Sequence, residues 1–221
     1  GPVNEKSTVV LVGGNMIMMT EWYDCVNSVI MAYYPGMEGG TALAEIIYGD
    51  VNPSGKLPYV VPYSEDDLPH VDWEATDQYY EYYHGYTRLE KNGVKPLVPY
   101  GFGLSYTTFD ISGPKACVEG DSLKVTAKVK NTGDVDGDEV VQLYVGFGNS
   151  AVDRPVKQLR GFCRVHVKAG EEKEVEITTP LEKLKWYNPV YREWQLEKME
   201  YPIYVGSSAA EEDLVKTVVR I

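Results

Sequence analysis

The chain has 221 residues, of which 43% are hydrophobic and 24% charged, as in a globular protein with a well-buried core and unlike a disordered chain. Its 21 basic and 33 acidic residues give a net charge of −12, so its field repels phosphate backbones and anionic membranes, and nucleic acid is not an expected partner. No apolar run approaches the roughly 18 residues that span a bilayer, and the first ten residues lack the basic and apolar regions of a signal peptide, so no membrane association is expected.

The cysteine pattern points to no specialised chemistry. Cys25, Cys117 and Cys163 are odd in number and widely spaced, and no C-x-x-C pair occurs. Such a pattern indicates reduced thiols rather than a zinc site, a redox centre or a disulfide framework. It favours the cytoplasm slightly over secretion, and the compartment otherwise stays unknown.

The first sixty residues alternate between short apolar runs and helical patterns, which is typical of βαβ units around a parallel sheet. The glycine-ended run TVVLVGG is expected to form a strand that is buried on both faces. In chain order we predict a strand over Thr8–Gly14, a short helix over Thr20–Asn27, a strand over Ser28–Tyr34, a helix over Thr41–Gly49 and a strand over Lys56–Pro62.

Residues 63–106 differ in composition, because acids and tyrosines dominate, with SEDD and YYEYYHGY as landmarks. An irregular segment of this length is uncommon inside a compact domain. We therefore expect a connector that is draped across a domain boundary.

Residues 107–221 alternate polar and apolar side chains at period two. The segments with this pattern are SLKVTAKVKNTG, DEVVQLYVGFG, KQLRGFCRVHVKAG, EKEVEITTP, YREWQLEK, YPIYVGSS and LVKTVVRI. With turn signals roughly 8 to 12 residues apart, they predict an antiparallel β-sandwich of about seven strands. The predicted fold class is therefore α/β plus all-β, with a partial parallel α/β unit at 1–62, a connector at 63–106 and the sandwich at 107–221.

Two turns resemble ligand-binding loops only in part. VGGN (Val12–Asn15) follows a strand as a dinucleotide-binding turn does, but the third glycine of G-x-G-x-x-G is absent, so a tight strand-to-helix turn is favoured. DVDGDE (Asp134–Glu139) has its glycine fourth, whereas an EF-hand calcium loop has it sixth, so a hairpin turn is favoured. No cofactor is expected.

The ionisable residues form no reactive constellation. His70, His84 and His166 lie far apart in unrelated contexts, which favours neither a metal cluster nor a nucleophile–base pair. SEDD (Ser64–Asp67) offers carboxylates of the kind a glycosidase needs, but a solvated acidic loop is the favoured interpretation. We predict no catalytic, cofactor-binding or metal-binding residue, and the substrate-binding residues are unknown.

Two aromatic stretches leave alternatives open. WYNPVYREW (Trp186–Trp194) could present flat rings to a sugar, although tyrosine and tryptophan in a β-hairpin are more often cross-strand pairs. PYGFGLSYTTF (Pro99–Phe109) has two glycines and many aromatic residues, as a ligand-cradling loop would have.

Four stretches, taken in order, resemble glycoside hydrolase family 3. AYYPGMEGGTALAEIIYGDVNPSGKLPYVVP resembles the end of the α/β sandwich domain of that family, and PYGFGLSYTTF resembles its junction with the next domain. VKNTGDVDGDEVVQLYV and RPVKQLRGFCRV resemble the fibronectin type III-like domain that follows. The resemblance covers Thr8 to Ile221, so the chain looks like the C-terminal part of such an enzyme.

The resemblance implies structural roles for the junction. Gly101 and Gly103 would supply tight backbone turns, while Phe102, Leu104 and Tyr106 pack. NPSGKLP (Asn52–Pro58) would join the last helix to the last strand with matching turn chemistry.

The resemblance also implies an activity, namely hydrolysis of β-linked glucosides or related sugars with retention, through an aspartate nucleophile and a glutamate acid/base. In the family the aspartate lies on a (β/α)8 barrel, and the glutamate lies upstream of the strand matched by TVVLVGG. Neither position is present, and Glu38 and Asp50 match structural positions rather than catalysts. We therefore expect a fragment that is inactive alone.

Several expectations about partners follow from this resemblance. The remainder of the parent enzyme, with the missing α/β half and the barrel, is the expected partner, and a β-glucoside or oligosaccharide is the expected substrate. YYHGYTRLEKNG is closer to members in which the barrel follows the sandwich, and both domain orders stay open. With about three of six sheet strands, the N-terminal unit should expose a sheet edge and self-associate through it.

Two alternative functions stay open. One is a stand-alone carbohydrate-binding or adhesion module, for which a truncated parallel sheet would have no use. The other is the same family with β-xylosidase or arabinosidase specificity.

Overall fold

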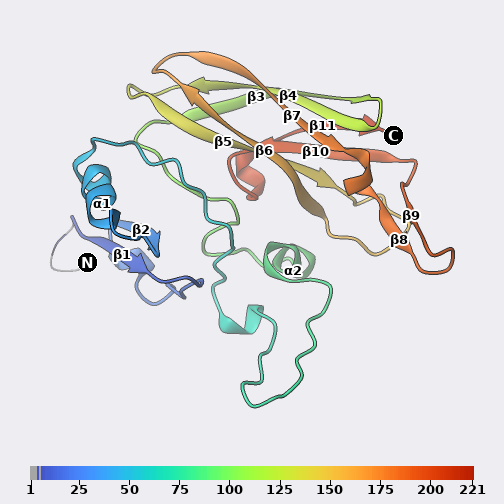
Figure 1. Ribbon diagram of the computed structural model, residues 1–221, viewed down its shortest axis with the longest axis horizontal. Helices are drawn as coiled ribbons and strands as arrows, with labels where there is room; N and C mark the ends of the chain where they lie inside the picture. Colours follow the sequence, from blue (N-terminus) through green and yellow to red (C-terminus); the bar gives the residue numbers. More distant parts are fainter. Residues whose placement is uncertain (1–3, 5) are drawn as a thin grey trace.

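The computed structural model describes residue 4 and residues 6–221. Figure 1 shows a two-layered β-structure in the C-terminal half, a small α/β unit near the N-terminus, and an extended connector between them. Among the described residues, no helix combines the length and the apolar character that a bilayer crossing requires.

Two parallel strands form the sheet of the N-terminal unit. Strand β1 (Thr8–Val12) pairs with β2 (Ser28–Tyr33), and both predicted strands are confirmed, but β1 is not buried on both faces as expected, because its residues are partly buried or exposed. Helix α1 (Gly39–Tyr48) follows and ends at Gly49, whose φ of 84° suits a residue without a side chain. The helix predicted over Thr20–Asn27 is reduced to a single 3-10 turn, η1 (Tyr23–Cys25), which has no side-chain cap to extend it.

The strand predicted over Lys56–Pro62 is wrong. This segment contributes only an isolated antiparallel bridge between Val61 and Val98. Pro58 and Pro62 lack the backbone N–H that a central strand needs. Val61 is nevertheless fully buried, in a small core with Met19 and Val98, so the apolar run packs without joining the sheet.

The connector is less irregular than expected. It contains a 3-10 turn, η2 (Glu65–Asp67), and an unpredicted helix, α2 (Gly85–Asn92), which Gly93 ends with a φ of 66°. Thr87 and Leu89 are the buried residues of α2.

The C-terminal half is an antiparallel sandwich of two sheets, with strand orders β11-β10-β5-β6 and β3-β4-β7. Its long strands are β3 (Phe109–Glu119), β4 (Ser122–Asn131), β5 (Gly137–Gly146), β6 (Lys157–Val167), β7 (Glu172–Pro180), β10 (Glu200–Gly206) and β11 (Leu214–Arg220). Two 3-10 turns, η3 (Leu181–Leu184) and η4 (Glu211–Asp213), complete it. The predicted fold class, an α/β unit followed by an antiparallel β-sandwich, is confirmed.

Two strand predictions in the sandwich need correction. Strand β3 was not predicted, because Gly113 and Pro114 interrupt its alternation; its register with β4 shifts between Ser112 and Lys115. The predicted strand YREWQLEK yields only β9 (Glu193–Gln195), which forms a short hairpin with β8 (Trp186–Asn188).

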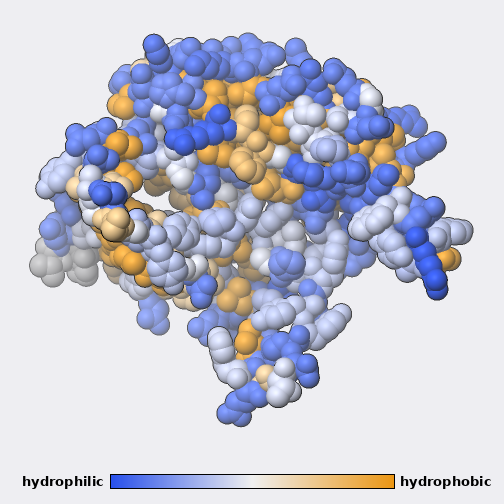
Figure 2. Space-filling model, in the orientation of Figure 1, coloured by the Kyte–Doolittle hydropathy of each residue, from blue (hydrophilic) through white to orange (hydrophobic). Residues whose placement is uncertain are grey.

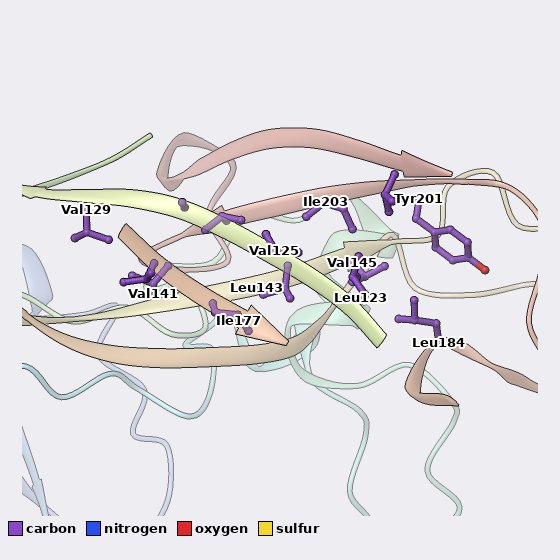
Figure 3. Close-up of a cluster of buried hydrophobic side chains, with 14 of the residues drawn as sticks. Leu123, Val125, Val129, Val141, Leu143, Val145, Ile177, Leu184, Tyr201 and Ile203 are labelled. Atoms are coloured by element: carbon purple, nitrogen blue, oxygen red, sulfur yellow. The ribbon is translucent and has the colours of Figure 1, made fainter. Parts of the chain in front are cut away.

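The main core lies between the two sheets. Figure 3 shows side chains of β4, β5, β7 and β10 meeting there, including Val125, Leu143, Ile177 and Ile203. Alternate residues of β4 are buried, from Leu123 to Val129, which is the period-two pattern of a strand with one face on a core.

The interpretation of DVDGDE as a hairpin turn is wrong. The strands on either side of it, β4 and β5, belong to different sheets, so the segment crosses from one layer to the other. Asp136 is fixed there because its carboxylate accepts a hydrogen bond from the backbone N–H of Ala169 at 2.8 Å.

Candidate functional site

The junction between the N-terminal unit and the sandwich gathers an unusual number of long-range polar contacts, and Asn52 is at their centre. Its amide Nδ2 donates to the carbonyl of Asp136 at 3.0 Å. Its Oδ1 accepts from Ser105 Oγ and from the backbone N–H of Tyr106, both at 2.8 Å. One side chain thus connects the helix-to-connector turn, the PYGFGLSYTTF segment and the crossover of the sandwich.

A buried ion pair lies beside this contact. Lys56 Nζ is 2.8 Å from Glu139 Oε1, and the two side chains are only 12% and 7% exposed. Lys56 also donates to the carbonyl of Gly103 at 3.2 Å. Because a buried charge is tolerated only when it is paired and hydrogen-bonded, this pair requires the N-terminal segment to stay docked on β5.

Both glycines of PYGFGLSYTTF lie close to other segments of the chain. Gly101 has a φ of 78°, and a Cβ there would lie 2.1 Å from Gln142 Oε1. Gln142 Nε2 donates to the Gly101 carbonyl at 3.0 Å. A Cβ on Gly103 would lie 2.0 Å from the Gly55 carbonyl oxygen. The close approach that glycine permits is therefore taken up by Gln142 and by backbone.

The packing expected around these glycines is only partly observed. Phe102 packs against the small core of the N-terminal unit. Tyr106 is half-exposed, but its hydroxyl donates to the carbonyl of Ile46. Leu104 does not pack as expected, because it is 71% exposed.

Helix α2 docks on strand β6 through two side chains on one face. Tyr86 Oη accepts a hydrogen bond from the backbone N–H of Leu159 at 3.0 Å, and burial raises the pKa of Tyr86 to about 12. Glu90 pairs with Lys157. Burial raises the pKa of Glu90 above its usual value, against the opposing effect of the Lys157 ammonium.

A second contact ties the segment before α2 and the last turn of α2 to the loop between β5 and β6. Tyr83 donates to Asp153 Oδ1 at 2.7 Å, and Lys91 Nζ lies 3.0 Å from Asp153 Oδ2. Lys91 also sits 3.7 Å from the centre of the Tyr83 ring. The hydrogen bonds from Tyr83 and Lys91 lower the pKa of Asp153.

The arrangement at this junction is suited to bracing. Glu139 is buried and Glu90 partly buried, and each carboxylate has a lysine partner. Glu38 and Asp50 are exposed, and Glu38 accepts a hydrogen bond from Thr41.

The other predicted turns and acids have local partners. VGGN follows β1, with the Gly13 N–H donating to the Tyr33 carbonyl at 3.1 Å, and a Cβ on Gly14 would meet the Tyr34 ring at 2.6 Å. SEDD forms η2, in which Ser64 and Asp67 make a capping box.

The histidines are distributed over unrelated elements. His70 is exposed and His84 precedes α2, whereas His166 lies on β6. His166 Nδ1 is 2.7 Å from Asp138 Oδ1, and Arg164 pairs with the same carboxylate. Burial pushes the pKa of Asp138 upward, but these two partners outweigh it and lower the pKa. Within residue 4 and residues 6–221, His, Cys, Asp and Glu form no group of three or more that could hold a metal ion.

The aromatic stretch WYNPVYREW forms the β8–β9 hairpin. Tyr187 and Trp194 are opposite each other in its register, and their rings meet edge to face with centroids 5.6 Å apart. The favoured interpretation as a cross-strand pair therefore describes these two rings, which are nevertheless 47% and 63% exposed.

Sequence reasoning missed the residues that make the junction. NPSG was interpreted as a local turn, although Asn52 bonds to residues 53, 54 and 84 positions away. A signal was present in β5, where the polar residues Glu139 and Gln142 lie among mostly apolar ones. Polar residues buried in such a strand require a specific partner.

Comparisons with known proteins match both the N-terminal unit with its connector and the sandwich. Two family models match the chain: the glycosyl hydrolase family 3 C-terminal domain over residues 2–106 and the fibronectin type III-like domain over residues 139–209.

Curated relatives match at similar levels. The chain is 39% identical to thermostable beta-glucosidase B of Acetivibrio thermocellus, over 98% of the chain and 30% of the relative. It is 36% identical to beta-glucosidase BoGH3A of Bacteroides ovatus, over 95% of the chain and 30% of the relative. It is also 36% identical to an exo-alpha-(1->6)-L-arabinopyranosidase of Bifidobacterium breve, over 97% of the chain and 29% of the relative.

Solved structures agree with these relatives. A beta-D-glucoside glucohydrolase from Trichoderma reesei superimposes with a TM-score of 0.92 at 26% identity, over 99% of the chain and 34% of that structure. The beta-glucosidase DesR from Streptomyces venezuelae superimposes with a TM-score of 0.90 at 34% identity, over 100% of the chain and 29% of that structure. The chain thus spans about a third or less of the proteins that it resembles.

Proposed function

From the premise that the chain belongs to glycosyl hydrolase family 3, we propose that it is a structural part of a retaining β-glucosidase-type hydrolase. It contains that family's C-terminal domain and a fibronectin type III-like domain, and it would hold the domains of the parent enzyme together. The parent enzyme would remove terminal β-D-glucosyl or related residues from oligosaccharides. The observation that carries this proposal is the match to enzymes named beta-glucosidase over 95% and 98% of the chain.

Retaining hydrolysis needs two carboxyl groups about 5 to 5.5 Å apart, one as nucleophile and one as acid and then base. We place both in the part of the parent enzyme beyond this chain. The pairing of the buried Glu139 carboxylate with Lys56 supports this assignment. The role left to this chain is to complete the α/β domain of the parent enzyme. It would also fix that domain to the sandwich through Asn52, Lys56 and Gln142.

The proposal is tested by comparing the chain with its complete parent enzyme on an aryl β-glucoside. We expect turnover by the parent and none above buffer by the chain. A parent enzyme that hydrolyses no β-glycoside would overturn the proposed activity.

A second specificity is favoured by one comparison. The arabinopyranosidase of B. breve is as similar to the chain as BoGH3A is, at 36% identity each. The parent enzyme would then prefer an aryl α-L-arabinopyranoside over an aryl β-glucoside. The ratio of kcat/KM for the two substrates decides between the two specificities.

We also propose that the isolated chain self-associates through its N-terminal unit. Among residue 4 and residues 6–221, the sheet there has two strands, so each has an edge without a strand partner in this part of the chain. Around the end of this sheet, Val12, Tyr34 and Met37 are 65%, 79% and 101% exposed. In the parent enzyme the remaining α/β half would cover these residues.

A further inference from the structure

The β8–β9 hairpin stands apart from both sheets of the sandwich. Its two strands pair only with each other, and Figures 1 and 2 show it projecting from one end of the molecule. Four of its apolar side chains are exposed although the hairpin is short: Tyr187 by 47%, Val190 by 81%, Tyr191 by 71% and Trp194 by 63%. The contacts described above between the N-terminal unit and the sandwich do not involve these four side chains.

Hydrogen bonds hold the hairpin in one conformation. Asn188 is buried, and its Oδ1 accepts from the backbone N–H groups of Val190 and Tyr191 at 3.0 and 3.3 Å. Its Nδ2 donates to Gln195 Oε1 at 2.9 Å, and Gln195 Nε2 donates to Glu193 Oε1 at 2.7 Å. A surface fixed in this way loses little conformational freedom when it binds a ligand.

The two paired rings form a corner. Tyr187 and Trp194 lie at an interplanar angle of 65°, so an edge of one ring is directed at the face of the other. Both side chains are about half-exposed, whereas Glu193 and Gln195, the neighbours of Trp194 in β9, lie on the opposite face of the hairpin, where Gln195 bonds to Asn188 and Glu193. Exposed aromatic side chains on a neutral, rigid hairpin suit a ligand that presents flat apolar faces to them.

The size and charge of the surface narrow the choice of ligand. These four side chains offer on the order of 500 Å², given roughly 150–250 Å² for a whole aromatic side chain, whereas a stable protein interface buries about 800 Å² on each partner. The charges of Arg192 and Glu193 cancel, so the hairpin is neutral although the chain carries −12. A small neutral ligand therefore fits better than a protein or a polyanion.

We propose that Trp194 and Tyr187 form a binding site for a β-linked gluco-oligosaccharide. The apolar C–H faces of pyranose rings would stack on the two aromatic rings, and their hydroxyl groups would stay hydrated. The choice of a β-linked glucan rests on the proposed function, whereas the class of ligand, a neutral sugar chain, rests on the geometry of the hairpin.

Isothermal titration of the chain with cellotetraose tests this site. The expected result is binding in the millimolar range that becomes at least about ten-fold weaker in Trp194→Ala, as loss of one stacked ring predicts. Trp194→Phe keeps an aromatic ring in the cross-strand pair and should retain most of the affinity. Trp73→Ala is the matched control, because Trp73 is 91% exposed on the connector, away from the hairpin.

Three results would overturn the site: no heat of binding from the unmodified chain, unchanged affinity in Trp194→Ala, or an equal loss in Trp73→Ala. If Trp194→Ala alters the circular dichroism spectrum, Trp194→Phe and Tyr187→Phe are measured instead. Both variants keep an aromatic ring, so a loss of all binding in both would contradict a stacking site. Because the binding assay needs no catalysis, this site and the proposed hydrolase activity can fail independently.

Discussion

Gly103 and Gly55 touch at the junction, but only Gly103 should be sensitive to a side chain. Alanine at Gly103 would place its Cβ 2.0 Å from the Gly55 carbonyl oxygen, which is backbone and cannot rotate away. Nothing lies within 4 Å of a Cβ at Gly55. We predict that Gly103→Ala lowers the free energy of unfolding by about 2–4 kcal/mol, as other strained or overpacked sites do, whereas Gly55→Ala changes it by less than about 1 kcal/mol. Urea titration of both variants measures the difference, and equal effects would contradict the described contact.

The Lys56–Glu139 pair makes a prediction about coupling. Removing one partner leaves the other charge buried and uncompensated, so Lys56→Met and Glu139→Gln should each cost about 3–5 kcal/mol. The double variant should recover a large part of this loss, because neither charge is then left without its partner. Additive losses in a double-mutant cycle would show that the two side chains do not interact.

At the scale of elements, α2 should make stability depend on pH through Glu90. Its pKa is raised in the folded chain, so its contribution is fully present below the usual value of 4.5 and is lost as the pH rises through the folded value. Glu90→Gln cannot ionise. The melting temperature of this variant relative to the unmodified chain should therefore rise as the pH increases from about 4.5.

The decisive quantity is how the difference in melting temperature between Glu90→Gln and the unmodified chain changes with pH. Glu90→Gln also leaves Lys157 without its carboxylate partner, so the change of the difference with pH is informative and the difference at a single pH is not. Glu182→Gln removes one exposed charge and is the control. A difference in melting temperature that is independent of pH would contradict the burial of Glu90.

Elements with strong periodicity could be predicted from the sequence, and elements governed by tertiary contacts could not. Strands β1, β2 and β4 form where their hydrophobic pattern predicts them; β4 has one face on the main core, whereas β1 and β2 are only partly buried. Helix α2 was missed because its eight residues have few apolar side chains, and its docking depends on Tyr86 and Glu90 reaching β6.

The junction was predictable in outline only. The need for glycine at positions 101 and 103 follows from the motif, but the atoms that come close, Gln142 Oε1 and the Gly55 carbonyl, belong to distant segments. Likewise, DVDGDE contains ordinary hairpin residues, and only the pairing of β4 and β5 in separate sheets makes it a crossover. The residues of a segment indicate that it turns, whereas the distant segments that it contacts depend on the topology of the fold.

At the scale of the whole molecule, the open edges of β1 and β2 predict self-association. In size-exclusion chromatography with light scattering, the mass of the chain should rise above 24.8 kDa as its concentration increases. Val12→Lys places a charge beside the sheet edge and should reduce this association. Val190→Lys, at an even more exposed valine on the β8–β9 hairpin, should leave it unchanged. A single mass of 24.8 kDa at every concentration would contradict the prediction.

The central claim is that this polypeptide braces an enzyme and supplies neither of its reacting carboxyl groups. The most direct measurement is the initial rate of the purified chain on an aryl β-glucoside at high protein concentration. The account predicts a rate equal to that of buffer. A rate above buffer that disappears when a glutamate or aspartate of this chain is replaced by its amide would contradict it.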